Sequence, residues 1–200
     1  MTAPAGPGRA NQKQRTRTAI VAAARQLTAA GGEVTMPAVA KAALVSEATA
    51  YRYFPDLVSL LQESFAGSWP SPAESMAAVA DSADVVERVA CAAAVLLRGV
   101  CARQGAVRAM ISASVTRPAV AATRPGVRFP LIDYALEPPA DLSSVPPARV
   151  AQLRLDLAVV VSAEALFTLT DLCGLPADEA IASAVRTART LARAALDGRD

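Results

Sequence analysis

A short segment in the first third of the chain carries the side chains that are best suited to contact a nucleic acid. Ser46, Thr49 and Tyr51 bear hydroxyl groups within little more than one helical turn. Arg52 adds a guanidinium group, and Ala48 is small enough for such a helix to approach a groove about 12 Å wide. Hydroxyl and guanidinium groups donate hydrogen bonds to phosphate oxygens and base edges, so the chemistry indicated here is binding of a polyanion.

The charges of the chain are unevenly distributed along the sequence. The net charge is only +2, but residues 1–57 carry seven Lys or Arg residues against three acidic residues. Residues 58–200 carry 13 against 15. A basic segment joined to a near-neutral remainder indicates that the two parts bind different partners, and we expect a polyanion to be the partner of the first.

Catalytic and metal-binding residues are scarce in this sequence. It contains no His, which removes Ser/His and Cys/His catalysis, His-bearing zinc sites and histidine pH switches. Cys91, Cys101 and Cys173 form no C-x-x-C pair, and no basic neighbourhood marks any of these thiols as activated for redox sensing. We therefore expect a protein that is not an enzyme and that needs no cofactor and no metal.

The composition predicts an all-α fold. Of the 200 residues, 53% are hydrophobic and only 4% aromatic, so the apolar mass comes mainly from Ala, Val and Leu, which favour close-packed helices. Residues 1–14 lack the apolar stretch of a secretory signal. The apolar segment Leu157–Leu169 is shorter than the roughly 20 residues that span a bilayer, and it is interpreted as a buried helix. We expect a cytoplasmic protein without a membrane partner.

Helical spacing and capping residues outline a small N-terminal domain. Gly31 and Gly32 end the first helix, and Thr35, Ser46 and Asp56 stand where the N-caps of three further helices are needed. The tight break between the second and third helices is typical of a helix-turn-helix. We expect a disordered basic arm over residues 1–13, a DNA-binding domain over 14–67, and helices over 14–30, 36–43, 47–54 and 57–66.

The segment 68–72, with two prolines and Trp69, marks the clearest domain boundary in the sequence. A larger helical domain is expected over residues 73–200. Its pattern predicts helices over 73–80, 83–103, 106–121, 131–136, 147–172 and 176–196.

The helix-turn-helix segment Val34–Phe54 carries a specific set of residues: Val39-Ala40, Ala43, Val45-Ser46, Thr49, Tyr51 and Tyr53-Phe54. An amphipathic helix ending in two glycines precedes it, and the helix containing Leu60-Leu61 follows it. With these residues the sequence resembles the TetR family of bacterial transcriptional regulators. The resemblance covers residues 14–67, and the remainder resembles the family only in its length and helical character.

The resemblance implies an all-α homodimer, with an N-terminal helix-turn-helix head of three or four helices and a larger helical ligand-binding and dimerisation domain. Each head would read DNA, the last two long helices would form the dimer, and a small-molecule effector would release the DNA. Thr35 and Tyr51 would bind phosphate, and Tyr53 would lie at the DNA backbone or at the groove edge. The exposed part of the recognition helix would comprise Ser46, Glu47, Ala48, Thr49 and Arg52, and Arg15 and Arg17 would add salt-sensitive phosphate contacts.

Three positions depart from the family pattern. Leu44 stands where the family usually has Gly, so it either adopts a left-handed conformation at a cost of about 1–2 kcal/mol or forces a differently shaped turn. Leu57 replaces a phosphate-binding Lys, and Pro37 replaces a residue that is often polar or basic. We therefore expect DNA affinity to depend on the N-terminal arm and on dimerisation.

Each of these residues also has a purely structural interpretation. Phe54 is expected in the core, and Tyr51 could pack there as well. Thr35 and Ser46 could be helix caps, a role that is compatible with phosphate binding because a helix N-terminus serves both. Arg15 and Arg17 could lie on an ordinary solvated face, and Arg52 could contact either guanine or phosphate.

The candidate ligand contacts of the larger domain are mostly apolar, as is usual for a small-molecule pocket between helices, and most of them are expected to prove core residues. Glu164 is the most specific candidate among them, because a carboxylate inside an apolar run is costly to bury without a partner. It is expected to face solvent, an Arg, a dimer mate or a ligand. The full set is Trp69, Met76, Met110, Phe129, Tyr134, Glu164 and Phe167.

Together these features predict a ligand-responsive transcriptional regulator, in particular a repressor that binds a palindromic operator as a dimer. The alternative is a helical protein-interaction or small-molecule-carrier module that has lost DNA reading, which the departures at Leu44 and Leu57 favour. An enzyme is a distant third hypothesis, because no catalytic constellation supports it.

Overall fold

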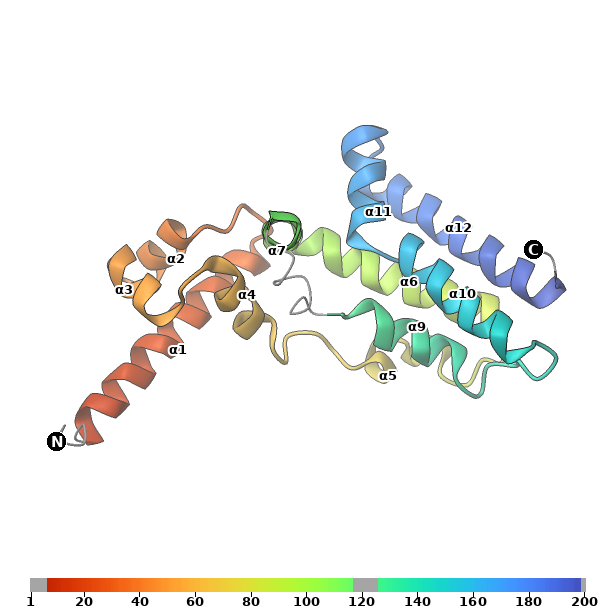
Figure 1. The fold of residues 1–200 in the computed structure, drawn as a ribbon, viewed down its shortest axis with the longest axis horizontal. Helices are drawn as coiled ribbons and strands as arrows, with labels where there is room; N and C mark the ends of the chain where they lie inside the picture. The colour runs from red at the N-terminus through yellow and green to blue at the C-terminus, as the bar shows by residue number, and fades with distance from the viewer. Residues whose placement is uncertain (1–6, 117–125, 199–200) are drawn as a thin grey trace. The chain divides into compact units, whose positions relative to one another are not determined.

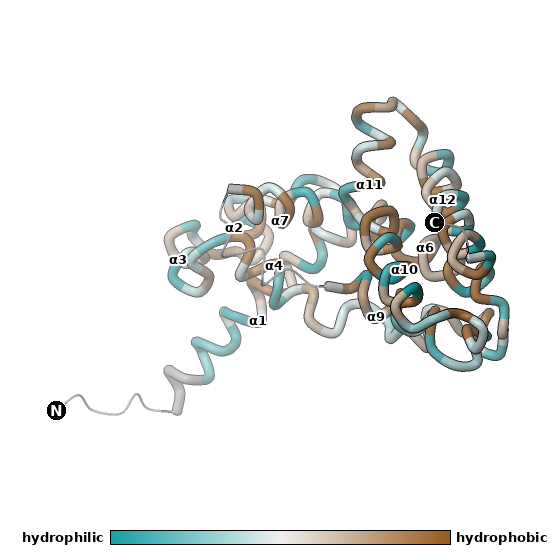
Figure 2. The backbone as a smooth tube through the Cα atoms, turned by 45° about the vertical axis from the view of Figure 1, so that its right-hand side comes forward, coloured by the Kyte–Doolittle hydropathy of each residue, from teal (hydrophilic) through white to brown (hydrophobic). Residues whose placement is uncertain are grey.

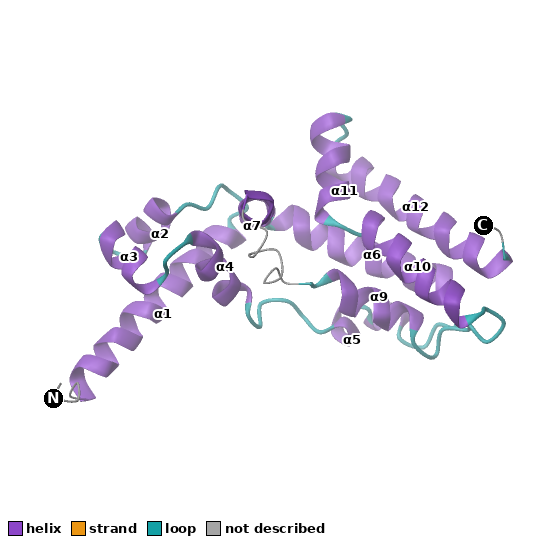
Figure 3. Ribbon diagram, viewed as in Figure 1, coloured by secondary structure: helices purple, strands orange, loops and turns teal. Residues whose placement is uncertain are grey.

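The structure is a computed structural model that describes residues 7–116 and 126–198, and every regular element in these ranges is a helix (Figures 1 and 3). The predicted all-α fold is therefore confirmed. The described residues form two compact units. One contains residues up to Trp69 together with those from Ala102 to the start of the undescribed stretch, and the other contains Pro70–Cys101 and the residues from Gly126 onwards.

Polar side chains cap the N-terminal ends of three short helices in the N-terminal unit. The Thr35 hydroxyl accepts a hydrogen bond from the Ala38 amide at 3.3 Å, and the Asp56 carboxylate accepts one from the Ser59 amide at 2.8 Å. Such side chains satisfy amide groups that have no partner within the first helical turn. The helices are α1 (Pro7–Ala29), α2 (Met36–Ala42), α3 (Glu47–Tyr53), α4 (Leu57–Phe65) and α7 (Gln104–Thr116).

The beginning of α1 differs from the sequence-based expectation. Residues 7–13, expected in a disordered arm, form the first turns of this helix. Pro7 occupies the first helical position, where the missing amide hydrogen costs nothing, and Ala, Gln and Lys residues that follow favour a helix. Figure 2 shows the coloured turns of α1 that follow its grey beginning as hydrophilic. Residues 1–6 lie outside the described part of the chain.

The core of the N-terminal unit brings together helices from distant parts of the sequence. Ile20 of α1, Val39 of α2 and Leu60 of α4 are each fully buried. Ala106 and Met110 of α7 join the same core, with exposed fractions of 1% and 4%. These two residues are four positions apart and therefore share one face of α7. The helix expected over residues 106–121 was assigned to the larger domain, but α7 packs with the first unit instead.

A close approach of two backbone segments fixes α7 to the turn between α1 and α2. A Cβ atom placed on Gly105 would lie only 1.8 Å from the carbonyl oxygen of Gly32 and 2.6 Å from its carbonyl carbon. Neither atom can rotate away, because both belong to the backbone. A residue without a side chain is therefore required at Gly105 for this contact.

Substitution of Gly105 by Ala is expected to lower the free energy of unfolding by about 3 kcal/mol, because the added methyl group must displace backbone. Gly32→Ala is the matched control, since a Cβ at Gly32 would meet no atom within 4 Å. Urea denaturation of both variants measures the difference. Equal stabilities of the two variants would contradict the proposed contact.

The second unit is a bundle of longer helices around an aliphatic core. Val89 of α6, Leu131 of α9 and Leu157 of α10 are almost completely buried, and Ala184 and Ala188 bury one face of the C-terminal helix. In Figure 1, α10 and α12 lie side by side, and they are in contact along their lengths. The elements are α5 (Pro72–Ser75), a 3-10 turn η1 (Ala77–Val79), α6 (Val85–Ala102), α9 (Arg128–Leu136), α10 (Pro147–Val160), α11 (Ala163–Phe167), a π-turn η2 (Thr168–Leu172) and α12 (Ala177–Asp197).

The prediction of a single helix over residues 147–172 is wrong. The backbone leaves helical geometry at Val161, and Ser162 caps a new helix by accepting a hydrogen bond from the Ala165 amide at 3.0 Å. Ser competes with helix continuation because its side chain can satisfy amide groups at a helix start. The expected burial of Leu157–Leu169 also holds only in part, since Leu157 is 1% exposed but Val159 is 71% exposed.

Other helix boundaries shift by smaller amounts. The helix expected over 73–80 is divided into α5 and η1, and the helix expected from Leu131 begins at Arg128. The end of the helix expected over 106–121 lies outside the described residues. None of the helices in ranges 7–116 and 126–198 is both long and apolar enough to cross a membrane.

Arg88 of α6 is a fully buried cation whose partners are backbone carbonyl groups. Its Nε donates to Ala135 at 3.1 Å, and one terminal nitrogen donates to Val79 at 2.9 Å. The other terminal nitrogen donates to Tyr134 at 2.5 Å, and the guanidinium lies 5.2 Å from the centre of the Tyr134 ring. Arg88 therefore links α6 to the end of η1 and to the C-terminal end of α9.

Candidate nucleic-acid interface

The helix α3 presents most of its surface to solvent. Ala50 is its one buried residue and contributes to the core of the N-terminal unit, where α3 packs against α2. This arrangement turns the remaining residues outwards. The exposed ones are Ser46, Glu47, Ala48, Tyr51 and Arg52, and Thr49 and Tyr53 are half-buried. All seven residues expected in the recognition segment are therefore brought together on one accessible helix.

The first turn of α3 is organised by a pair of hydroxyl groups. The Ser46 hydroxyl accepts a hydrogen bond from the Thr49 amide at 3.2 Å and donates one to the Thr49 hydroxyl at 2.9 Å. Ser46 is thus the predicted N-cap. Because the Thr49 hydroxyl accepts this bond, its own hydrogen stays available to an outside acceptor. The Thr35 hydroxyl likewise caps α2 as an acceptor and can still donate.

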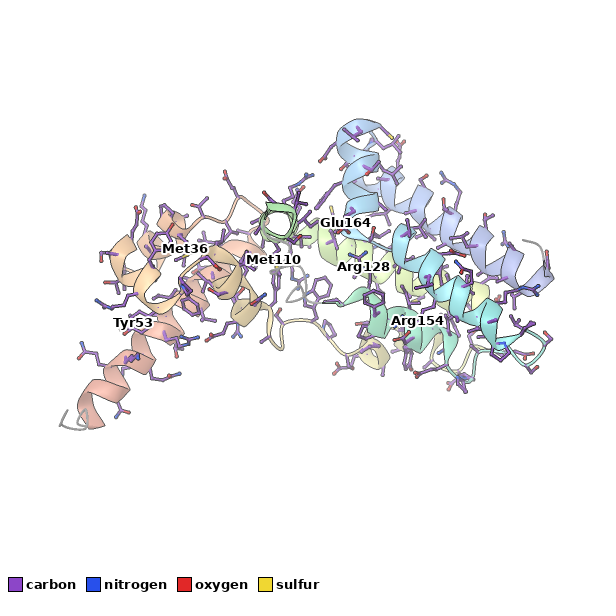
Figure 4. The ribbon with its side chains drawn as sticks, in the orientation of Figure 1. Met36, Tyr53, Met110, Arg128, Arg154 and Glu164 are labelled. Atoms are coloured by element: carbon purple, nitrogen blue, oxygen red, sulfur yellow. The ribbon has the colours of Figure 1, made fainter. Side chains whose placement is uncertain are left out.

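The aromatic residues at the end of α3 divide into a buried and an exposed group. Phe54 is 1% exposed and belongs to the core, as predicted. Tyr51 is 48% exposed, so packing of its ring in the core is excluded. Tyr53, labelled in Figure 4, packs partly against the core, and the Arg52 guanidinium lies 5.7 Å from the centre of its ring. Tyr51 and Arg52 are the long side chains with which α3 can reach outward.

Arg17 is held by contacts inside the N-terminal unit. It forms an ion pair with Glu63 of α4, and its Nε donates to a Glu63 oxygen at 3.0 Å. It also donates to the Tyr53 carbonyl at 3.5 Å and lies 4.5 Å from the centre of the Phe54 ring. The hydrogen bonds to Glu63 raise the pKa of the Arg17 guanidinium above its ordinary value. Arg17 therefore links α1, the end of α3 and α4, a role that sequence reasoning missed.

Two other arginines of α1 have different surroundings. Arg25 donates to the Ser64 and Ala66 carbonyls at the end of α4, at 2.9 and 3.2 Å, and so satisfies helix-terminal acceptors. Arg15 lies on the exposed side of α1. Of the two α1 arginines expected to bind phosphate, Arg15 has the exposure that this role requires, whereas Arg17 forms an ion pair with Glu63.

The turn between α2 and α3 contains an exposed and strained residue. Leu44 has a φ angle of 56°, so it adopts the left-handed conformation that was one of the two expected outcomes. Its side chain is 92% exposed. Leu57 is half-buried at the start of α4 and packs against the core, so this position supplies no cation to phosphate.

The candidate ligand contacts are divided between the two units. Trp69 and Met110 belong to the N-terminal unit, where both pack on its core and Arg103 lies 4.8 Å from the centre of the Trp69 ring. Met76 is fully buried in the second unit, and Phe167 is half-buried there. Sequence reasoning grouped these residues because a pocket between helices is mostly apolar. An apolar pattern does not show which helices pack together, so it could not assign these residues to one site.

Three other candidates in the second unit are tied to arginines (Figure 4). Glu164 forms an ion pair with Arg128 at 3.0 Å, which is one of the outcomes expected for its carboxylate. The Arg154 guanidinium lies 5.0 Å from the centre of the Phe129 ring. Tyr134 lies against the buried Arg88. These contacts give each of the three candidates an arginine partner within this unit.

A groove of about 530 Å³ lies between α6 and α12 and contains none of the predicted ligand contacts. Its walls include Ala90 and Ala182, whose small side chains leave room between the two helices. Cys91 also lines the groove; burial, followed by the nearby Glu87 carboxylate, raises the pKa of its thiol. A thiol with a raised pKa reacts slowly as a nucleophile, which argues against a redox role.

Comparison with known proteins gives a match to a family model and matches to solved structures. The family model described as "Bacterial regulatory proteins, tetR family" matches residues 20–63, which contain the end of α1, α2, α3 and most of α4. The fold is similar to that of a TetR transcriptional regulator from Rhodococcus sp. RHA1, with a TM-score of 0.50 and 22% sequence identity. The alignment covers 90% of this chain and 97% of that chain. A search of curated proteins found no match.

Proposed function

We propose that this chain is a regulator of the TetR family that represses transcription by binding a palindromic operator as a dimer that a small molecule releases, a proposal that the family-model match over residues 20–63 and the similar fold support. The observation that carries this proposal is the exposure of α3. This helix buries only Ala50 and turns hydroxyl groups and a guanidinium outwards. A helix with this surface fits the major groove, where its N-terminal residues contact base edges.

The residues of α3 divide between bases and phosphates. Thr49 lies in the first turn, where it offers a methyl group to thymine and a hydroxyl hydrogen to a base acceptor. Tyr51 and Arg52 extend from the helix to phosphates, and the Thr35 hydroxyl adds a donor at the start of α2. Arg15 supplies a salt-sensitive phosphate contact from α1.

A dimer supplies a second recognition helix, which binds the second half-site of the operator. Leu155 and Val159 of α10 are 57% and 71% exposed and lie four residues apart, so they share one face of the helix. Such an apolar face is suited to a two-fold contact with a second copy of the chain, with α12 alongside. Two recognition helices must lie about 34 Å apart to enter successive major grooves, so a small swing of the heads abolishes simultaneous contact.

The small molecule that causes this swing is proposed to bind the second unit. The groove between α6 and α12 has a volume within the range of about 300–1,000 Å³ that is usual for such sites. In this function the protein catalyses no reaction and requires no metal. Within the described residues, no three Cys, Asp or Glu side chains gather as metal ligands do.

A second candidate function is a helical protein-interaction or small-molecule-carrier module that no longer reads DNA. The exposed Leu44 and the absence of a cation at Leu57 favour it. The two functions differ in their salt dependence. DNA binding weakens steeply as the salt concentration rises, whereas the alternative predicts no binding to duplex DNA.

Removal of single hydroxyl groups from α3 tests the proposed contacts. Thr49→Ala and Tyr51→Phe are each expected to weaken operator binding by about tenfold or more, because each removes a hydrogen bond in both half-sites. Ser144→Ala, which removes an exposed hydroxyl group from the loop before α10, is the matched control and is expected to bind as the unchanged protein does. Fluorescence anisotropy with a labelled operator duplex measures the affinities. Unchanged affinity of both α3 variants would refute the assignment.

A further inference from the structure

Leu44 combines two features that are unfavourable in the isolated chain. Among the described residues it is the one non-glycine position with a positive φ angle, 56°. Its side chain is 92% exposed, so it gains almost nothing from burial. A glycine would adopt this conformation without strain, because it has no Cβ.

The turn itself does not require a leucine. Its hydrogen bonds are made by the backbone: the Leu44 amide donates to the Lys41 carbonyl at 3.2 Å, and the Val45 amide donates to the Ala40 carbonyl at 3.0 Å. Glycine would make the same bonds. Backbone strain without a gain inside the fold is typical of residues that act on something outside it.

The position of Leu44 indicates which partner it meets. It lies two residues before Ser46, the N-cap of α3, and the N-terminal end of a recognition helix is the end that enters the major groove. The exposed Lys41 precedes it in the last turn of α2, so the surroundings suit an anionic partner. In the major groove, the apolar group available to a leucine is the C5-methyl group of thymine.

We infer that Leu44 contacts the methyl group of a thymine in each half-site and thereby selects thymine at that position. This inference rests on the proposed function, since it assumes that α3 reads DNA. The contact is distinct from those of α3, because Leu44 belongs to the turn. It explains why a strained leucine occupies a position at which the fold would accept glycine.

Two variants separate strain from contact. Leu44→Gly is expected to raise the melting temperature, because strain is relieved, and at the same time to weaken operator binding about fourfold per half-site, the effect of one lost apolar contact. Asn also tolerates the left-handed conformation but adds less backbone flexibility than Gly. Leu44→Asn is therefore expected to bind the operator as weakly as Leu44→Gly does, because both variants lack the apolar side chain. Differential scanning fluorimetry and anisotropy measure the two quantities. A purely structural leucine predicts that Leu44→Gly binds as tightly as the unchanged protein.

Single replacements of thymine by deoxyuracil in the operator locate the contact. The unchanged protein is expected to lose about fourfold in affinity at one symmetry-related pair of positions, where the methyl group is removed. Leu44→Gly is expected to show no loss at those positions. If both proteins respond equally to every replacement, the inference fails. If the unchanged protein binds no duplex, the proposed function itself fails, and the two failures are thus distinguishable.

Discussion

Replacement of Arg88 by alanine is expected to lower the free energy of unfolding by more than about 4 kcal/mol, the largest stability effect in the second unit. The guanidinium donates to six backbone carbonyl groups and is fully buried. Those of Tyr134 and Ala135 belong to the last turn of α9, where carbonyl groups lack helical partners and carry partial negative charge. The substitution would leave these acceptors buried without donors and create a cavity beside them.

Two further variants make the Arg88 prediction specific. Arg98→Ala removes an exposed arginine from the same helix and is expected to change stability by less than about 0.5 kcal/mol. Arg88→Lys keeps the charge but cannot span both groups of carbonyls, so its stability is expected to lie between the two alanine variants. Urea denaturation followed by circular dichroism measures all three. If Arg88→Ala and Arg98→Ala are equally stable, the carbonyl contacts do not hold this unit together.

A charge placed at Val159 is expected to dissociate the dimer and to reduce operator affinity by about 100-fold or more, because the second half-site is lost. Val159 is 71% exposed on α10, and Leu155 lies on the same face. In a two-fold interface Val159→Arg would bring two like charges close together and would bury them without partners. Sedimentation velocity at micromolar concentration measures the oligomeric state, and anisotropy measures DNA binding.

Val115→Arg controls for the effect of replacing any exposed valine by arginine. Val115 is 76% exposed on α7, a helix of the N-terminal unit, whereas the proposed dimer face belongs to the second unit, and the Val115→Arg variant is expected to sediment as the unchanged protein does. A Val159→Arg protein that still sediments as a dimer would place the dimer contact on another surface. A monomeric variant with full operator affinity would instead contradict the need for two half-sites.

Features that depend on nearby residues could be predicted from the sequence. The caps at Thr35, Ser46 and Asp56 were correct, because a cap and the amide it satisfies lie within three residues of each other. Phe54 was expected in the core and is buried there, and the exposed surface of α3 was expected from the resemblance to the TetR family. Even the left-handed Leu44 was one of two outcomes that local sterics allowed.

Features that depend on distant residues could not be predicted in this way. Met110 lies far along the sequence from the residues of α1, α2 and α4 whose core it joins. The spacing of apolar residues around Met110 shows an apolar helix face without showing what covers that face. Arg17 resembled a DNA contact because Glu63, its ion-pair partner, lies 46 positions further along the chain. Arg88 gave no signal, because its acceptors are carbonyl groups that every residue possesses.

The break at Ser162 shows a different limit. The residues around it have a continuous apolar pattern, and a serine within a helix is common, so periodicity alone favoured an uninterrupted helix. The structure shows the serine acting as a cap instead, with its hydroxyl also donating to the Val159 carbonyl at 2.7 Å. The choice between the two states depends on packing, which the sequence pattern does not report.

Binding of the purified protein to duplex DNA from the region upstream of its own gene tests the central claim most directly. Mobility shift with footprinting at two salt concentrations is the measurement. We expect a protected site with two-fold symmetry and an affinity that falls steeply with salt, as neutralisation of several phosphates requires. No shift on this DNA or on random genomic fragments would contradict DNA recognition by α3 and favour the protein-interaction or carrier function.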